Sequence, residues 1–367
     1  MALAGAALFL SCYDDVGTFY DLVRNDGLLI GLLAWSLVCA RHGRMAMAGI
    51  LLTLAFLTKH NAAIFGVSIL WWAWRTGGWP LARRFVLFSV GPALLSTLVL
   101  QWSTDGLFLT YVLGLLAHHP FVWGRLLVTA PIEIFGALVI TNIMVLCHTL
   151  VRFFGSPPKS SHHQTGETYW FAQACVAIVF SAVMRGHHGG FINVLIPAVW
   201  SLAFCGALVV GWCRRRWNTL LTIGCTSLLV ASQLWLGRWS LSDVVPSETA
   251  RQAGAGLIME LEQIDGEILA PQFPYYPVLA GKQPFFHLQA ARDINHEGSA
   301  LLGSLNSISQ DVAEHRWEAV LVSDRQGVGF EIPQHYPDAQ RLPETASPRP
   351  TVGWPVRPRY LLRPEAQ

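Results

Sequence analysis

Long apolar runs separated by short basic segments dominate the first two thirds of the chain. The runs fall at 27–40, 45–74, 85–101, 126–150, 169–184, 191–213 and 218–237. A helix needs about 20 residues to cross a hydrocarbon layer of about 30 Å, and most of these runs have that length or nearly so. The chain is 53% hydrophobic and 13% charged, which is typical of a membrane protein. We therefore predict an all-α polytopic membrane domain over residues 1–237.

The placement of basic residues sets the expected topology. Four segments, at 41–44, 75–84, 151–168 and 214–217, hold ten of the fourteen Lys and Arg residues before position 238. Cytoplasmic loops carry such an excess. All four segments lie on one side only if 45–74 crosses twice, with a turn at Lys59 in "TKHN". This topology gives about eight spans plus an N-terminal stub, "MALAGAALFL".

Residues 238–367 have a different composition, with sixteen acidic and eleven basic residues. We predict a small α/β domain on the outer side of the membrane, with helices near 247–264 and 299–314 and strands at 267–270, 317–323 and 359–363. The proline-rich stretch 333–357 is expected to be irregular. A net charge of +2 and the lack of a nucleic-acid-binding motif argue against a nucleic-acid partner.

Four carboxylates are candidates for catalysis. The predicted topology places Asp14, Asp15 and Asp26 on the outer side, and Glu133 is the only acid inside a predicted span, where carboxylates are rare and usually functional. Two of the four have a structural alternative: Asp26 and Arg24 can pair as a cap of the 27–40 span, and Glu133 can satisfy backbone donors freed by Pro131.

Cations and histidines on the same side are candidates for binding a substrate. Lys59 lies between apolar helices and must reach water, a carboxylate or an anionic ligand such as a phosphate; snorkelling to headgroups is the alternative. The turn "MRGHHGGFIN" is suited to a phosphate or sugar, or is simply a polar interhelical loop. The segment 105–125 is apolar, aromatic and interrupted by a proline, as in a helix lying in the interface. The candidate binding residues are Lys59, Arg24, His118, His119, Arg185, His187, His188 and Asn193.

No metal site or bound cofactor is predicted. Histidine pairs occur at 118–119, 162–163 and 187–188. Adjacent histidines on a helix point about 100° apart, and no cysteine or carboxylate completes a recognisable ligand spacing.

Three stretches together resemble a known family. "FYDLVRNDGLLIGLLAWSLVCAR" (19–41), "GILLTLAFLTKHNAAIFGV" (49–67) and "RGHHGGFINVLIP" (185–197), followed by an outer domain, are similar to bacterial GT-C glycosyltransferases of the protein mannosyltransferase and aminoarabinose transferase type. The resemblance covers roughly residues 10–210. It implies an enzyme of the bacterial inner membrane that transfers a sugar, with inversion, from a polyprenyl-phosphate donor to a lipid, glycan or protein acceptor.

In that family the lysine of the "LTK" stretch lies near the lipid phosphate, and the matching position here is Lys59. A cation there would stabilise the phosphate leaving group while a carboxylate deprotonates the acceptor. The family's catalytic acid follows a first span, and Asp14 and Asp15 do not match it by position. We therefore expect a chain truncated at its N-terminus, or alternatively a non-enzymatic subunit that binds the lipid carrier. A transporter is disfavoured because no repeated pair of broken helices is visible.

Overall fold

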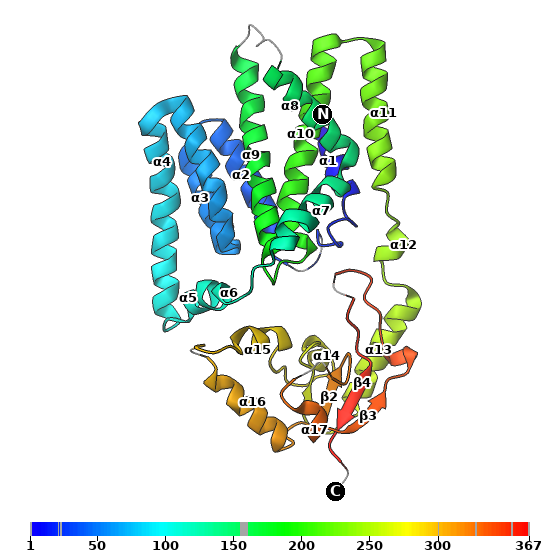
Figure 1. Cartoon of the computed structure of the whole chain (residues 1–367). Helices are drawn as coiled ribbons and strands as arrows, with labels where there is room; N and C mark the ends of the chain where they lie inside the picture. The colour runs from blue at the N-terminus through cyan, green and yellow to red at the C-terminus, as the bar shows by residue number, and fades with distance from the viewer. Residues whose placement is uncertain are drawn as a thin grey trace. The chain divides into compact units, whose positions relative to one another are not determined.

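The computed structural model describes residues 2–20, 22, 24–154, 161–299, 301–326, 329–353 and 355–365. The chain forms two compact units. The first comprises Met1–Val112 and His119–Trp239, and the second comprises Leu113–His118 and Ser240–Gln367. Helices make up the first unit, whereas the second combines helices with a four-stranded sheet (Figure 1).

The helical unit contains elements long enough to cross a membrane. Its principal helices are α1 (Ala2–Ser11), α2 (Asp26–Arg41), α3 (Met45–Thr58), α4 (Phe65–Ser103), α7 (Ala130–Ala137), α8 (Val139–Phe154), α9 (Ser161–Gly186), α10 (Ile196–Trp217) and α11 (Leu220–Leu236). Within the described residues, four helical segments are long and apolar enough to span, or five if α7 and α8 are parts of one broken span. The prediction of about eight spans is not confirmed by this measure, since α2 and α3 are shorter helices.

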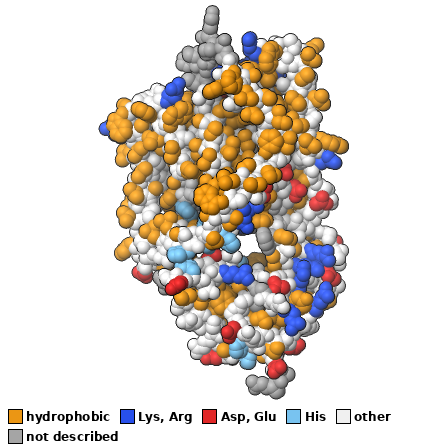
Figure 2. All heavy atoms as spheres, in the orientation of Figure 1, with side chains coloured by type: hydrophobic (Ala, Val, Ile, Leu, Met, Phe, Trp, Pro, Cys, Tyr) orange, Lys and Arg blue, Asp and Glu red, His pale blue; other side chains and the backbone are white. Residues whose placement is uncertain are grey.

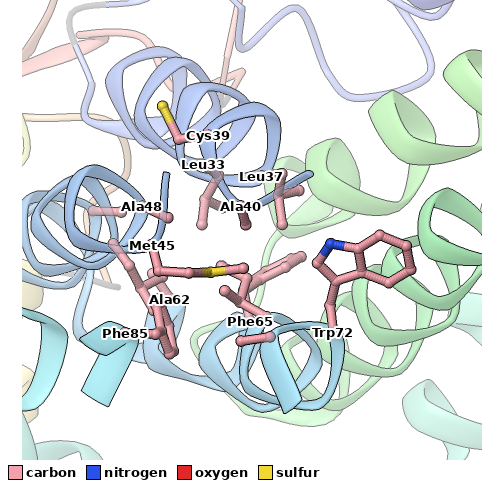
Figure 3. Packing of buried hydrophobic residues seen from close by; sticks show 14 of the residues in the cluster. Leu33, Leu37, Cys39, Ala40, Met45, Ala48, Ala62, Phe65, Trp72 and Phe85 are labelled. Atoms are coloured by element: carbon pink, nitrogen blue, oxygen red, sulfur yellow. The ribbon is translucent and has the colours of Figure 1, made fainter. Parts of the chain in front are cut away.

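The packing of the helical unit suits a protein surrounded by lipid. Leu33 and Leu37 of α2 face Met45 of α3 and Phe65 of α4 in a closed apolar cluster (Figure 3). Leu98 of α4, in contrast, is 67% exposed. Apolar side chains also cover most of the helical surface visible in Figure 2. Because such a surface is unfavourable in water, the exposed leucines support the prediction of a membrane domain.

The run 45–74 is broken at Lys59, as the distribution of basic residues predicted. Helix α3 ends at Thr58, Lys59 has extended backbone angles (φ −154°, ψ 107°), and the short 3₁₀ helix η1 (His60–Ile64) leads into α4. Helices α3 and α4 then pack closely, with the backbone of α4 against Gly49. A second reversal lies within the range labelled α4, where Gly78 takes a positive φ of 63°.

The run 126–150, expected as a single span, bends by 98° between α7 and α8. The side chains of two residues satisfy the backbone groups freed at the bend. Gln233 Oε1 accepts from the N–H of Ile140 at 2.9 Å, and Asn142 Nδ2 donates to the carbonyl of Ile134 at 3.1 Å. Unpaired backbone groups are costly in an apolar surrounding, so these partners allow the helix to break.

The second unit begins with α12 (Leu241–Val244) and α13 (Glu248–Glu262). It continues through β1 (Ile268–Leu269), α14 (Tyr275–Leu279), α15 (Leu288–Ile294), α16 (Gly303–Ala313), β2 (Ala319–Val322), α17 (Ile332–His335), β3 (Asp338–Arg341) and β4 (Tyr360–Arg363). The strand order is β1-β2-β4-β3, with β1 parallel to β2 and β4 antiparallel to both of its neighbours. The predicted elements are present with shifted ends. The expectation that 333–357 is irregular is wrong for Asp338–Arg341, which form β3 and pair with β4.

Candidate functional site

The site is built around Asp26, the first residue of α2. A carboxylate at the N-terminus of a helix is favoured by the helix dipole. Its side chain is only 4% exposed, so it must be satisfied from within the protein. The amide of the preceding residue, Asn25, donates to the carbonyl of Thr58 at 2.8 Å. This bond ties the start of α2 to the end of α3, which brings Lys59 to Asp26.

Three side chains from different segments donate to Asp26. Lys59 Nζ lies 2.5 Å from Oδ1, and Arg24 Nε lies 3.2 Å from Oδ2. The Asn193 amide, from the 3₁₀ helix η4 (Ile192–Leu195), donates to both oxygens at 3.2 and 3.1 Å. Arg24 also lies over the ring of Phe19, 5.1 Å from its centroid, and is about half exposed. The four predicted residues Arg24, Asp26, Lys59 and Asn193 therefore form one cluster.

A small cavity adjoins this cluster. It is lined by Asp26, Lys59, Asn61 and Asn193, by Met184, and by apolar residues of α2, α9 and the start of α10. Its volume is about 10 Å³, which is room for a single water molecule. Asn61 donates to the sulfur of Met184, while its buried Oδ1 has no partner among the described residues. A water in the cavity would supply that missing donor.

The chemistry of the cluster favours binding over proton transfer. Both oxygens of Asp26 already accept from cationic or amide donors, so neither is placed to take a proton from a substrate hydroxyl. Lys59 and Arg24 carry two positive formal charges and Asp26 one negative charge, so the cluster has a net formal charge of +1. An excess positive charge beside a partly exposed lysine suits an anionic group such as a phosphate.

An apolar groove lies between α3 and α4, the helices on either side of Lys59. It has a volume of about 380 Å³ and is lined along α3 and both arms of α4, including Leu52, Phe56, Ala63, Val67 and Leu94. This volume is within the range of ligand pockets. Phe56 and Ala63 lie within four residues of Lys59 along the chain. An apolar chain in this groove would therefore begin close to Lys59.

Glu133 and Arg185 pair with one another. Arg185 Nε and Nη2 donate to the two carboxylate oxygens of Glu133 at 2.8 and 2.9 Å, and Nη1 donates to the carbonyl of Gly190 at 2.9 Å. The structural alternative raised for Glu133, bonding to backbone donors near Pro131, is not what the structure shows. Neither residue lines the cavity beside Asp26.

The predicted histidines fall into two groups. His119 lies 5.1 Å from His187 and 6.1 Å from His188 between ring centroids, where the segment around Phe121 forms a bridge with His187. His118 stacks on His296 at 3.9 Å within the second unit. No group of three or more metal-ligating side chains occurs in the part of the chain that the structure describes. The side chains of residues 162 and 163 lie outside that part.

Asp14 and Asp15 lie in the turns that follow α1, exposed and outside the cavity lining. Partial desolvation, together with the neighbouring Asp14, raises the pKa of Asp15. Sequence reasoning missed Asn25 and Asn61, although both flank residues that it selected. Their polar side chains, next to Asp26 and two residues after Lys59 respectively, were the available signal.

No family model, curated protein or solved structure matches this chain.

Proposed function

We propose that this chain binds a polyprenyl-phosphate lipid at the Asp26 cluster, in the bacterial inner membrane, and takes part in transferring a sugar from that carrier to a lipid, glycan or protein acceptor. The observation that carries the proposal is that Lys59 of the cationic cluster lies between α3 and α4, the two helices that line the apolar groove. A long-chain lipid phosphate has these two parts. In this proposal the membrane domain has about eight spans, and the α/β unit lies on the outer side.

The role of each residue follows from its contacts. Lys59 is 22% exposed and Arg24 is 48% exposed, so both can reach an anionic headgroup while Asp26 holds them in place. Positive charge there would stabilise the phosphate that forms when the sugar leaves. Because the oxygens of Asp26 already accept from Lys59, Arg24 and Asn193, an exposed carboxylate such as Asp15 is the better candidate for accepting the proton of the acceptor hydroxyl.

A second candidate function is binding of the lipid carrier without catalysis. It is favoured by the occupation of both Asp26 oxygens, which leaves this carboxylate with no free lone pair directed at a substrate. The two functions share the lipid site and differ only in chemistry.

The test uses the full chain in lipid nanodiscs. Binding of polyprenyl phosphate is measured by native mass spectrometry, with the uncharged polyprenol of the same length as the control ligand. We expect the phosphate to bind at least about tenfold more tightly, because one charge-assisted hydrogen bond contributes about 1.5 kcal/mol or more. Equal binding of the two lipids would refute the proposal.

Turnover then separates the candidates. The nanodiscs receive polyprenyl-phosphate-linked hexose or pentose together with membrane lipid acceptors, and the released polyprenyl phosphate is quantified. Release that Lys59→Met abolishes supports the transferase. Selective binding with no release from any donor supports the carrier-binding subunit.

A further inference from the structure

We infer that Glu133 and Arg185 are positioning residues that hold the Asn193 amide against Asp26. The inference deepens the proposed lipid-phosphate site and relies on that proposal for one of its two readouts. Sequence reasoning placed Glu133 among the catalytic candidates and Arg185 among the binding candidates. Their bidentate pairing instead directs each toward the other.

Arg185 connects two elements. It lies at the C-terminal end of α9, and its planar guanidinium uses two nitrogens for Glu133 on α7 and the third for the carbonyl of Gly190. The rigid fork of an arginine makes these three bonds interdependent, because movement of the carboxylate rotates the whole group. Glu133 thereby controls the nitrogen that reaches Gly190.

The loop between Arg185 and Asn193 is tight, so the position of the Gly190 carbonyl affects the position of the Asn193 side chain. The N–H of Gly190 donates to the carbonyl of His187 at 2.8 Å. A Cβ at Gly190 would lie only 1.9 Å from the carbonyl oxygen of Met184, so the chain returns directly onto the end of α9. Helix η4 starts two residues later and carries Asn193, which is 3% exposed. Displacement of the Gly190 carbonyl therefore displaces the Asn193 amide.

Glu133 is also held from outside this loop. It lies on α7, just before the bend, and Gln233 of α11 bonds on both sides of that bend, to the carbonyl of Ala137 and the N–H of Ile140. The Glu133 carboxylate thus gives Arg185 a fixed reference point.

The Asn193 amide affects how the cations of the site can act. It donates to both oxygens of Asp26 and so shares the carboxylate with Lys59 and Arg24. Without it, Asp26 would draw more strongly on the two cations and leave them less available to an anionic headgroup. Loss of the Glu133–Arg185 pair is therefore expected to weaken phosphate binding at a distance.

The test is a double-mutant cycle of Glu133→Gln and Asn193→Ala in the full chain, read by the affinity for polyprenyl phosphate and by the unfolding temperature. We expect each single variant to lower the affinity about tenfold, the effect of one hydrogen bond to a charged group. The double variant should bind about as weakly as Asn193→Ala alone. Additive losses, giving about a hundredfold, would overturn the inference, as would an unchanged affinity for Glu133→Gln.

A lipid-independent readout separates this inference from the proposed function. Distant sites without shared partners have additive effects on stability. We expect the losses in unfolding temperature for the two variants to be less than additive, whereas Glu344→Gln, at an exposed ion pair, should add fully to Asn193→Ala. If the wild type binds no polyprenyl phosphate, the proposed function fails and the stability cycle still decides the positioning role. Glu133→Asp, which keeps the charge on a shorter side chain, replaces Glu133→Gln if that variant does not fold.

Discussion

Replacing Lys59 and replacing Asp26 should lower the stability of the protein by different amounts, although the two residues form one ion pair. Replacing Lys59 by Met leaves a carboxylate that is 4% exposed without its shortest contact. Removing one member of a buried pair costs about 3–5 kcal/mol. Arg24 and Asn193 remain bonded to Asp26, so we expect a loss of about 2–3 kcal/mol for Lys59→Met. Asp26→Asn should cost less, about 1 kcal/mol, because Lys59 can turn toward water.

The double variant Asp26→Asn, Lys59→Met removes both charges and nearly preserves the side-chain volumes. Uncharged replacements of a buried ion pair are often neutral. We therefore expect its stability to return to within about 1 kcal/mol of the wild type, while selective binding of polyprenyl phosphate over polyprenol is lost. The variant thus separates folding from ligand binding.

The assay is thermal unfolding of the purified proteins in one detergent, followed by intrinsic fluorescence. A loss of about 2 kcal/mol corresponds to a decrease of roughly 4–8 °C in unfolding temperature for a domain of this size. The order expected from lowest to highest is Lys59→Met, Asp26→Asn, then the double variant near the wild type. A double variant as unstable as Lys59→Met, or an Asp26→Asn that is the least stable, would refute the reasoning.

Three further predictions concern other parts of the chain. Gly190→Ala should lower the free energy of unfolding by roughly 3 kcal/mol, because its Cβ would lie 1.9 Å from a carbonyl oxygen. The control Gly124→Ala, whose Cβ would lie in open space, should change the free energy of unfolding by less than about 0.5 kcal/mol in the same thermal assay. Gln233→Leu removes the partner of three backbone groups at the α7–α8 bend and should cost about 3 kcal/mol; wild-type unfolding temperature would contradict this. The hydrogen bond from Arg357 holds the pKa of Glu344 below its usual 4.5, so its stabilising contribution is present above pH 4.5 and is lost as the pH falls through the lowered pKa. Glu344→Gln should therefore lose less stability than wild type on acidification below that pH, and a parallel acid titration would contradict this.

The sequence alone determined the helical character of the first unit and the turn at Lys59. Both follow from properties that act locally: an apolar run must be buried or face lipid, and basic residues resist crossing the membrane. The strands of the α/β unit were also predictable, because buried runs such as Ala319–Val322 carry their pattern in a few consecutive residues. Strand β3, "DAQR", is mostly exposed and polar, so nothing in its own residues announces that it pairs with β4.

Only the tertiary structure decided which polar residues act together. Asp26, Lys59 and Asn193 are separated by up to 167 positions, yet the ends of α2 and α3 and the start of η4 bring them within hydrogen-bond distance. Glu133 and Arg185 resembled separate functional candidates in the sequence, and only the packing of α7 against α9 makes them partners. Sequence patterns report whether a residue is buried or exposed, whereas pairing between distant side chains depends on how helices pack, which no local pattern records.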